Sequence, residues 1–212
     1  MSFPAVLSAL ALAIVPARAE VVETTALGFS VREATEVTAA PDEAWAVLVR
    51  PAEWWSAAHT FSGNPANLSL DAMAAGCFCE VLPSTVSPRA APRGSVMHMM
   101  VVYAEQGRAL RMTGALGPMQ SEGLHGALTI TLKPLDGGGT RIGWEYVVGG
   151  YMRFAPGQIA PAVDRVLAEQ ATRLAARLGP KAPPSAPAPA KPEPSVNAAA
   201  KPMKRETGET GR

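Results

Sequence analysis

The chain has 212 residues, of which 48% are apolar and 17% charged, and its formal net charge is +1. This size and apolar content suit one ordinary domain with a buried core. The near-zero net charge provides no basic field for nucleic acid, so we expect no nucleic-acid partner. No apolar run approaches the roughly 20 residues that a membrane-spanning helix needs. Two cysteines are too few for a disulfide-stapled mini-protein.

The two ends of the chain differ from its middle. Residues 1–19 contain an apolar stretch of ten residues followed by Ala17-Arg18-Ala19, which is typical of a secretory signal peptide cleaved before Glu20. The first residues carry no Lys or Arg, so an apolar N-terminal arm is the alternative. Residues 179–212 are rich in Pro, Ala and Lys, which predicts a disordered tail. We therefore predict an exported, periplasmic protein with one domain over residues 20–178.

The first half of this domain alternates strands with short helices. Residues 31–38 form a β-rich run, after which Pro41 suits the first turn of a helix that reaches about Val49. Pro51 ends this helix and begins another short helical turn. Two short strands and a Pro- and Arg-bearing loop follow, over residues 67–70, 77–82 and 83–93.

The second half contains an antiparallel sheet and a long helix. Four segments have the period-two alternation of half-buried strands, over residues 94–103, 109–113, 124–133 and 140–148. In the last two strands the even-numbered residues are apolar and are expected to face inward. An amphipathic helix follows, with Pro161 near its first turn and Gly179-Pro180 after its end. One apolar sheet face and one long helix must be buried against each other.

Several stretches resemble the SRPBCC superfamily, which includes START-type lipid carriers, birch-pollen-allergen relatives, polyketide cyclases and the activator of the heat-shock-protein ATPase. The first is Ala39-Ala40-Pro41-Asp42-Glu43-Ala44-Trp45, and the others lie within residues 110–120, 139–151 and 162–170. The resemblance covers about residues 30–178. It implies an α+β helix-grip fold, a curved antiparallel sheet wrapped around a C-terminal helix with a cavity between them. It says little about activity, because this superfamily hosts several functions.

A cavity of this kind would be lined by inward-facing Met and aromatic side chains, which suit a small hydrophobic ligand, lipid-like or aromatic. The predicted ligand-binding residues are Trp54, Trp55, Met97, Met99, Leu110, Met112, Trp144, Tyr146 and Gln170. Gln170 lies within the apolar stripe of the long helix, where a wet or ligand-filled cavity would accept its amide. The alternatives are plain core packing of the methionines and a Gln170 that bonds a backbone carbonyl or tilts toward solvent.

The hairpin turn over residues 104–107 decides which side chains face inward. A loop of two or four residues would place Met97, Met99 and Tyr103 on the inner face and His98 outside. A three-residue loop would instead turn His98 and Met100 inward.

No nucleophile, metalloprotease, phosphate-binding or dinucleotide motif is present in the sequence. Binding or transport of a hydrophobic molecule is therefore the first hypothesis. A cyclase/dehydrase-type enzyme acting on a polyketide-like substrate is the second, with His59, Glu33, Tyr146 and His98 as candidate acids or bases. A protein-interaction domain of the heat-shock-ATPase-activator type is the third, and its partner is unknown.

Cys77 and Cys79 occupy positions i and i+2 of a predicted strand, where their Cβ atoms are too far apart for a disulfide without a local bend. We therefore interpret them as two small buried side chains, although Gly76 could provide a bend and export would favour oxidation. A Cu(I) site formed by these thiols with Met97 and Met99 is a less favoured alternative. No known metal motif occurs, so we expect neither metal nor cofactor.

Overall fold

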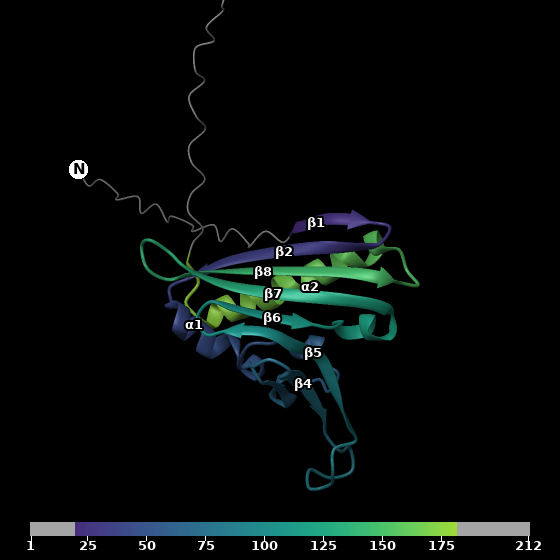
Figure 1. Cartoon of the computed structure of the whole chain (residues 1–212). Coiled ribbons are helices and arrows are strands. Elements are labelled where there is room, and N and C mark those ends of the chain that lie inside the picture. The colour runs from purple at the N-terminus through teal and green to yellow at the C-terminus, as the bar shows by residue number, and fades with distance from the viewer. Residues whose placement is uncertain (1–19, 182–212) are drawn as a thin grey trace, which may run out of the picture.

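The computed structural model describes residues 20–181, so the predicted signal peptide and most of the predicted tail lie outside the described residues. The chain forms one eight-stranded antiparallel sheet and one long helix (Figure 1). The strands are β1 (Glu20–Thr25), β2 (Gly28–Val37), β3 (Leu68–Leu70), β4 (Cys77–Leu82), β5 (Gly94–Glu105), β6 (Ala109–Thr113), β7 (Gly123–Pro134) and β8 (Thr140–Tyr151). The helices are α1 (Pro41–Leu48) and α2 (Pro156–Arg177), with 3-10 turns η1 (Pro51–Glu53), η2 (Ala57–His59), η3 (Pro65–Asn67) and η4 (Gly117–Ser121).

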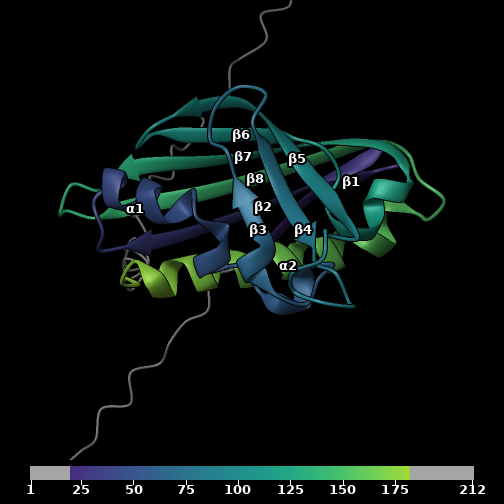
Figure 2. The ribbon, with the colours of Figure 1, turned by 90° about the horizontal axis from the view of Figure 1, so that it is seen from below.

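The sheet curves around α2, which confirms the helix-grip fold. Its strand order is β1-β2-β8-β7-β6-β5-β4-β3. The second strand of the chain, β2, therefore pairs with the last one, β8. Figure 2 shows α2 lying along one side of the curved sheet, with the short helical turns filling the space beside it. None of the described helices is long and apolar enough to cross a membrane.

The end of α2 is tied back to β2. The Thr38 amide donates to the Gly179 carbonyl over 2.7 Å, and the Lys181 amide donates to the Glu36 carbonyl over 2.8 Å. Residues 179–181, which the composition assigns to the tail, are therefore hydrogen-bonded to the chain at the end of β2. The helix itself begins at Pro156, earlier than expected, so Pro161 lies inside it and not in its first turn.

The predicted alternation of β7 and β8 is confirmed. Leu128, Ile130 and Leu132 on β7 are buried, as are Ile142, Trp144, Tyr146 and Val148 on β8. Trp144 packs edge-on against Trp54, with ring centroids 5.9 Å apart. The centre of the layer between sheet and helix is therefore solid, with a residual gap of only about 10 Å³ beside these rings.

Two β-bulges in β5 determine which of its residues face inward. The hairpin loop has three residues, since Glu105 pairs with Ala109, but the register shifts between Val101 and Tyr103. A second shift places Met97 opposite Cys79 and leaves His98 as the extra residue. Each bulge reverses the alternation that follows it. His98, Met99 and Val101 are consequently buried, whereas Met97 and Tyr103 are exposed, contrary to the alternation expected from an unbulged strand.

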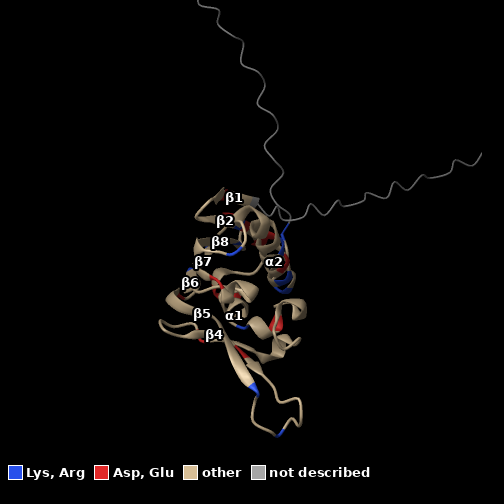
Figure 3. Ribbon diagram, turned by 90° about the vertical axis from the view of Figure 1, so that its right-hand side faces the viewer, with Lys and Arg blue, Asp and Glu red and all other residues tan. Residues whose placement is uncertain are grey.

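Charged residues avoid the space between sheet and helix, with few exceptions. Figure 3 shows basic residues along α2 and at the tip of the long loop between β4 and β5. The buried charged residues are Glu33 and Glu80, which are 3% and 0% exposed. A buried carboxylate is stable only if it is paired, hydrogen-bonded or neutralised by a raised pKa.

Candidate functional site

One end of the space between sheet and helix is hollow. The cavity there has a volume of about 300 Å³. Its walls come from the first half of α2, from η2 and the residues after it, from η4 and from β5. The lining residues are Trp55, Ala58, His59, Thr60, Phe61, His98, Leu116, Gly117, Pro118, Met119, Ile159, Ala162, Val163, Val166 and Leu167. The surface is mostly apolar, with two histidines and one threonine as its polar side chains.

The loop that forms one wall is fixed to α2 by polar contacts. The Ser56 amide donates to Gln170 Oε1 over 2.9 Å, and Arg173 Nε donates to the Trp54 carbonyl over 2.8 Å. His59 Nε2 lies 2.9 Å from Glu169 Oε2 at the rim of the cavity. Hydrogen bonds from Ser56 and His59 hold the pKa of Glu169 below its usual 4.5. This wall is therefore positioned before any ligand arrives.

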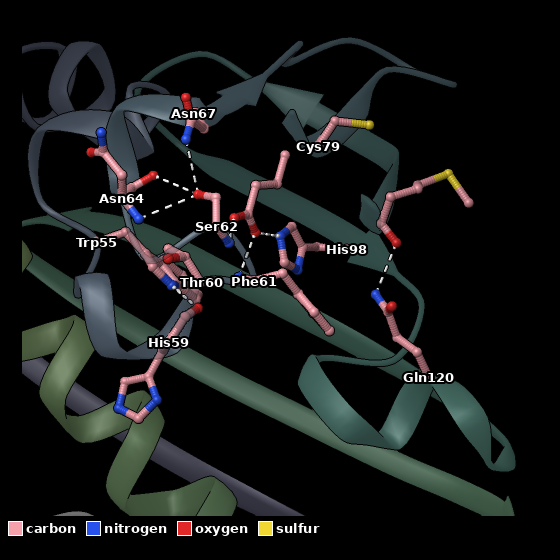
Figure 4. Close-up of polar contacts among 12 residues, drawn as sticks. Trp55, His59, Thr60, Phe61, Ser62, Asn64, Asn67, Cys79, His98 and Gln120 are labelled. Atoms are coloured by element: carbon pink, nitrogen blue, oxygen red, sulfur yellow. Dashed lines mark hydrogen bonds and ion pairs between the residues drawn. The ribbon is translucent and has the colours of Figure 1, made fainter. Parts of the chain in front are cut away.

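A buried carboxylate, that of Glu80, is hydrogen-bonded to His98. His98 Nε2 lies 3.0 Å from Glu80 Oε2, a contact drawn as a dashed line at the labelled His98 ring in Figure 4. These side chains are 5% and 0% exposed. The Glu80 carboxylate also accepts from the amides of Phe61, at 3.0 Å, and Ser62, at 2.5 Å. The Ser62 hydroxyl is itself held by Asn64 and Asn67. Glu80 is thus satisfied on several sides and orients the imidazole.

The pKa shifts of this pair follow from its surroundings. Burial would raise the pKa of Glu80, but hydrogen bonds from Ser62, Phe61 and His98 outweigh it and hold the value below 4.5. Burial among apolar groups, including the Phe78 ring at 5.0 Å, lowers the pKa of His98 below 6.5, although Glu80 partly opposes this shift. His98 is therefore neutral at pH 7. Because a carboxylate only accepts, Nε2 carries the proton and Nδ1 keeps a lone pair.

Of the nine predicted ligand-binding residues, only Trp55 lines this cavity. Leu110, Met112, Trp54 and Trp144 surround the small central gap, and Met99 is buried in the core. Tyr146 is buried with its hydroxyl 3.3 Å from both the Gly114 carbonyl and the Leu116 amide. Met97 lies on the outer face of the sheet with 62% of its surface exposed, so its predicted inward orientation is wrong.

Gln170 satisfies neither simple expectation. It is fully buried, and its Oε1 accepts from the Ser56 backbone amide instead of facing the cavity. Its Nε2 has no hydrogen-bond partner among the described residues. The side chain therefore acts as a link between α2 and the loop after η1.

The Glu80–His98 pair is not among the contacts predicted from the sequence. A signal for it exists, because Glu80 alternates with Phe78 on the inner face of β4, and an inward carboxylate needs a partner. The loop over residues 114–120 contributes Leu116, Pro118 and Met119 to the cavity, whereas the loop over residues 149–154 contributes no lining residue.

Cys77 and Cys79 form a disulfide with Cα atoms 5.3 Å apart, so the interpretation as separate buried thiols is wrong. The required bend coincides with the register shift between Phe78 and Cys79. A loop of three residues removes little entropy from the unfolded chain, about 1.5 kcal/mol against about 3 kcal/mol for a 15-residue loop. The structural benefit of this bridge is therefore small.

The chain is similar to several solved structures at low sequence identity. A protein from Rhodobacter sphaeroides is 18% identical, with a TM-score of 0.46, over 76% of this chain and 97% of its own. CalU16 from Micromonospora echinospora is 13% identical, with a TM-score of 0.44, over 76% of this chain and 88% of its own. DynU16, described as a putative protein in the dynemicin biosynthetic locus, is 16% identical, with a TM-score of 0.45, over 70% of this chain and 46% of its own.

A search of curated proteins gave no match. The family model described as "Polyketide cyclase / dehydrase and lipid transport" matches residues 28–179, which include every strand from β2 to β8, α2 and all the cavity walls. This match covers well over half of the chain. The protein therefore belongs to the polyketide cyclase/dehydrase and lipid transport family, within the SRPBCC superfamily.

Proposed function

We propose that this protein binds a small, largely apolar molecule, lipid-like or aromatic, whose one polar group lies beside His98. The cavity carries this proposal. Its volume of about 300 Å³ lies at the lower end of the range for small-molecule sites, about 300–1,000 Å³. Its walls are apolar apart from a few polar side chains, and such a combination gives affinity through burial and orientation through one or two hydrogen bonds.

Filling the cavity should abolish binding. Ala162 lines the cavity from α2, and Ala162→Phe places a ring in the space that a ligand would occupy. The probe is 1-anilinonaphthalene-8-sulfonate, whose fluorescence rises in apolar sites. We expect the variant to bind it at least about tenfold more weakly, which corresponds to about 1.4 kcal/mol.

Ala176→Phe is the matched control, because Ala176 is exposed on the same helix and lies away from the cavity. It should bind the probe as the parent does. Native mass spectrometry of the purified parent should in addition show a co-purified small molecule that Ala162→Phe lacks. Equal probe affinity in both variants would rule out the cavity as the binding site.

The Glu80–His98 pair favours a second candidate function, acid–base chemistry of the cyclase/dehydrase type. A neutral His98 can accept, at Nδ1, a proton from a carbon next to a ligand carbonyl, and the Glu80 carboxylate stabilises the resulting imidazolium. The same proton can then pass to a departing hydroxyl, which leaves as water. The family description names both cyclase/dehydrase and lipid transport, so both candidates stay within it.

This candidate predicts that His98→Gln separates catalysis from binding. The measurement is deuterium exchange at the α-carbons of 2-tetralone, a bicyclic ketone, followed by NMR in D₂O. We expect the parent to catalyse exchange. Its rate should rise with pH below 6.5, as His98 loses its proton, and should level off near neutral pH. His98→Gln should lower the catalysed rate by at least about 100-fold. Binding of the fluorescent probe should change little, and equal exchange rates would leave only the binding role.

A further inference from the structure

A set of four sulfur atoms lies on the outer face of the sheet, away from the cavity. The inner residues of β4 are Phe78 and Glu80, so Cys77 and Cys79 point to the opposite, outer face, where both are half-buried. In the register of β4 and β5, Cys77 pairs with Met100 and Cys79 pairs with Met97. Directly opposed residues of antiparallel strands have Cβ atoms about 4.5–5.5 Å apart.

The bulge that turns His98 inward also brings these methionines to the outside. Met97 and Met100 are three residues apart, and without the extra residue they would face opposite sides of the strand. With the bulge, their side chains are 62% and 39% exposed. Flexible thioether side chains on this face can therefore reach the sulfur atoms of the neighbouring strand.

We propose that the reduced form of this protein binds one Cu(I) ion through Cys77, Cys79, Met97 and Met100. Thiolate and thioether sulfurs are the soft ligands that select Cu(I). The disulfide shows that the two cysteine sulfurs can meet at one point, so reduction leaves two thiols able to chelate one ion. The proposal replaces Met99, considered from the sequence, with Met100, because Met99 is buried on the inner face.

The chemistry balances with a dithiol as the reductant. The dithiol transfers two electrons and two protons to the Cys77–Cys79 disulfide and becomes a cyclic disulfide itself. Cu(I) then binds both thiols, two protons leave for solvent, and the thioethers coordinate without losing a proton. Among the described residues, no group of three or more His, Cys, Asp or Glu side chains could hold a metal ion, so this site would depend on its methionines.

The test uses the full chain, reduced with dithiothreitol and gel-filtered under anaerobic conditions. It is titrated with Cu(I) supplied as its acetonitrile complex, in competition with bicinchoninate. We expect one equivalent of Cu(I) per reduced chain and none for the oxidised chain. The double variant Met97→Ala/Met100→Ala should bind at least about tenfold more weakly. The double variant Cys77→Ser/Cys79→Ser should not compete with bicinchoninate.

Met73→Ala is the matched control, since Met73 is 61% exposed but lies in the loop before β4, outside the four-sulfur set. It should bind Cu(I) as the parent does. Reduced parent protein that fails to take one equivalent, or a Met97→Ala/Met100→Ala variant with unchanged affinity, would overturn the proposal. Circular dichroism of each variant shows whether the fold is retained, and a Cys-free variant that stays folded keeps the comparison valid.

Discussion

Replacing Glu80 with alanine is expected to lower the free energy of unfolding by about 3–5 kcal/mol, because three hydrogen-bond donors lose their acceptor. Glu80 is fully buried and accepts from His98 Nε2 and from the amides of Phe61 and Ser62. Alanine leaves the buried His98 donor and the part-buried amides of Phe61 and Ser62 without their acceptor, and each unsatisfied group carries its own desolvation cost. The measurement is urea unfolding at pH 7, followed by tryptophan fluorescence.

Glu105→Ala is the matched control, because Glu105 also accepts a hydrogen bond from another side chain, Arg108, but on the surface. Exposed ion pairs contribute about 0–1 kcal/mol. A loss below about 1 kcal/mol for Glu80→Ala would contradict the buried hydrogen-bond arrangement.

The conservative change Glu80→Gln separates stability from proton placement. A glutamine carbonyl at the Oε1 position can still accept from the Ser62 amide, so the loss of stability should be smaller than for alanine. The amide group then occupies the Oε2 position, where the Phe61 amide loses its acceptor and the glutamine NH2 donates to His98 Nε2. The His98 proton accordingly moves to Nδ1. We therefore expect Glu80→Gln to lose most of the proposed exchange activity while remaining folded.

Acid should destabilise the parent through the same pair. The pKa values of His98 and Glu80 both lie below their ordinary values of 6.5 and 4.5. The unfolded chain therefore takes up protons that the folded protein refuses. The contribution of His98 and Glu80 to the free energy of unfolding is complete above pH 6.5. It is lost as the pH falls, first through the pKa of His98 and then through the pKa of Glu80.

Periodicity in the sequence was enough to predict the elements and the sheet but not the cavity. The alternation of β7 and β8 is regular because each residue has one partner across the strand, and it places Trp144 and Tyr146 on the inner face. In β5, the two bulges shift the register by one residue each. A bulge has no sequence signature as strong as the alternation it interrupts, so the orientation of Met97 and His98 could not be read from parity.

The position of the cavity depends on how completely the packed side chains fill the space between sheet and helix. No local sequence pattern predicts this. Trp54 and Trp144 fill the centre of the layer, so the cavity is displaced toward the first half of α2 and η4. The resemblance to the superfamily implied a cavity, but the residues around it come from loops whose paths depend on long-range contacts such as Ser56 with Gln170. Of the nine predicted ligand-binding residues only Trp55 lines the cavity, together with His59 and His98 from the candidate acids and bases.

Glu33 is the second buried carboxylate, and its surroundings differ from those of Glu80. It faces inward from β2, opposite Trp144, and is 3% exposed. Neither of its oxygens has a hydrogen-bond partner among the described residues. Burial first, and then the negative charge of Asp164, raise the pKa of Glu33 from 4.5 to about 7.

The sign of the resulting pH dependence is opposite to that of Glu80. Between pH 4.5 and 7, the folded protein holds a proton on Glu33 that the unfolded chain releases. The stability contribution is therefore complete below pH 4.5 and is lost as the pH rises through about 7. Above that value the buried carboxylate is ionised without a partner, which costs about 3 kcal/mol at 1.36 kcal/mol per pKa unit.

Glu33→Gln should consequently stabilise the protein at high pH. Glutamine has nearly the same shape and no charge to bury, so we expect a gain of about 2–3 kcal/mol at pH 8 that shrinks toward zero near pH 4.5. The measurement is urea unfolding of parent and variant across this range. Because His98 and Glu80 are present in both chains, the difference in unfolding free energy between parent and variant isolates Glu33.

Glu23→Gln, on the exposed part of β1, is the control and should change stability by less than about 0.5 kcal/mol. A gain for Glu33→Gln that does not vary with pH would show that the carboxyl titrates normally and that its burial is relieved in solution.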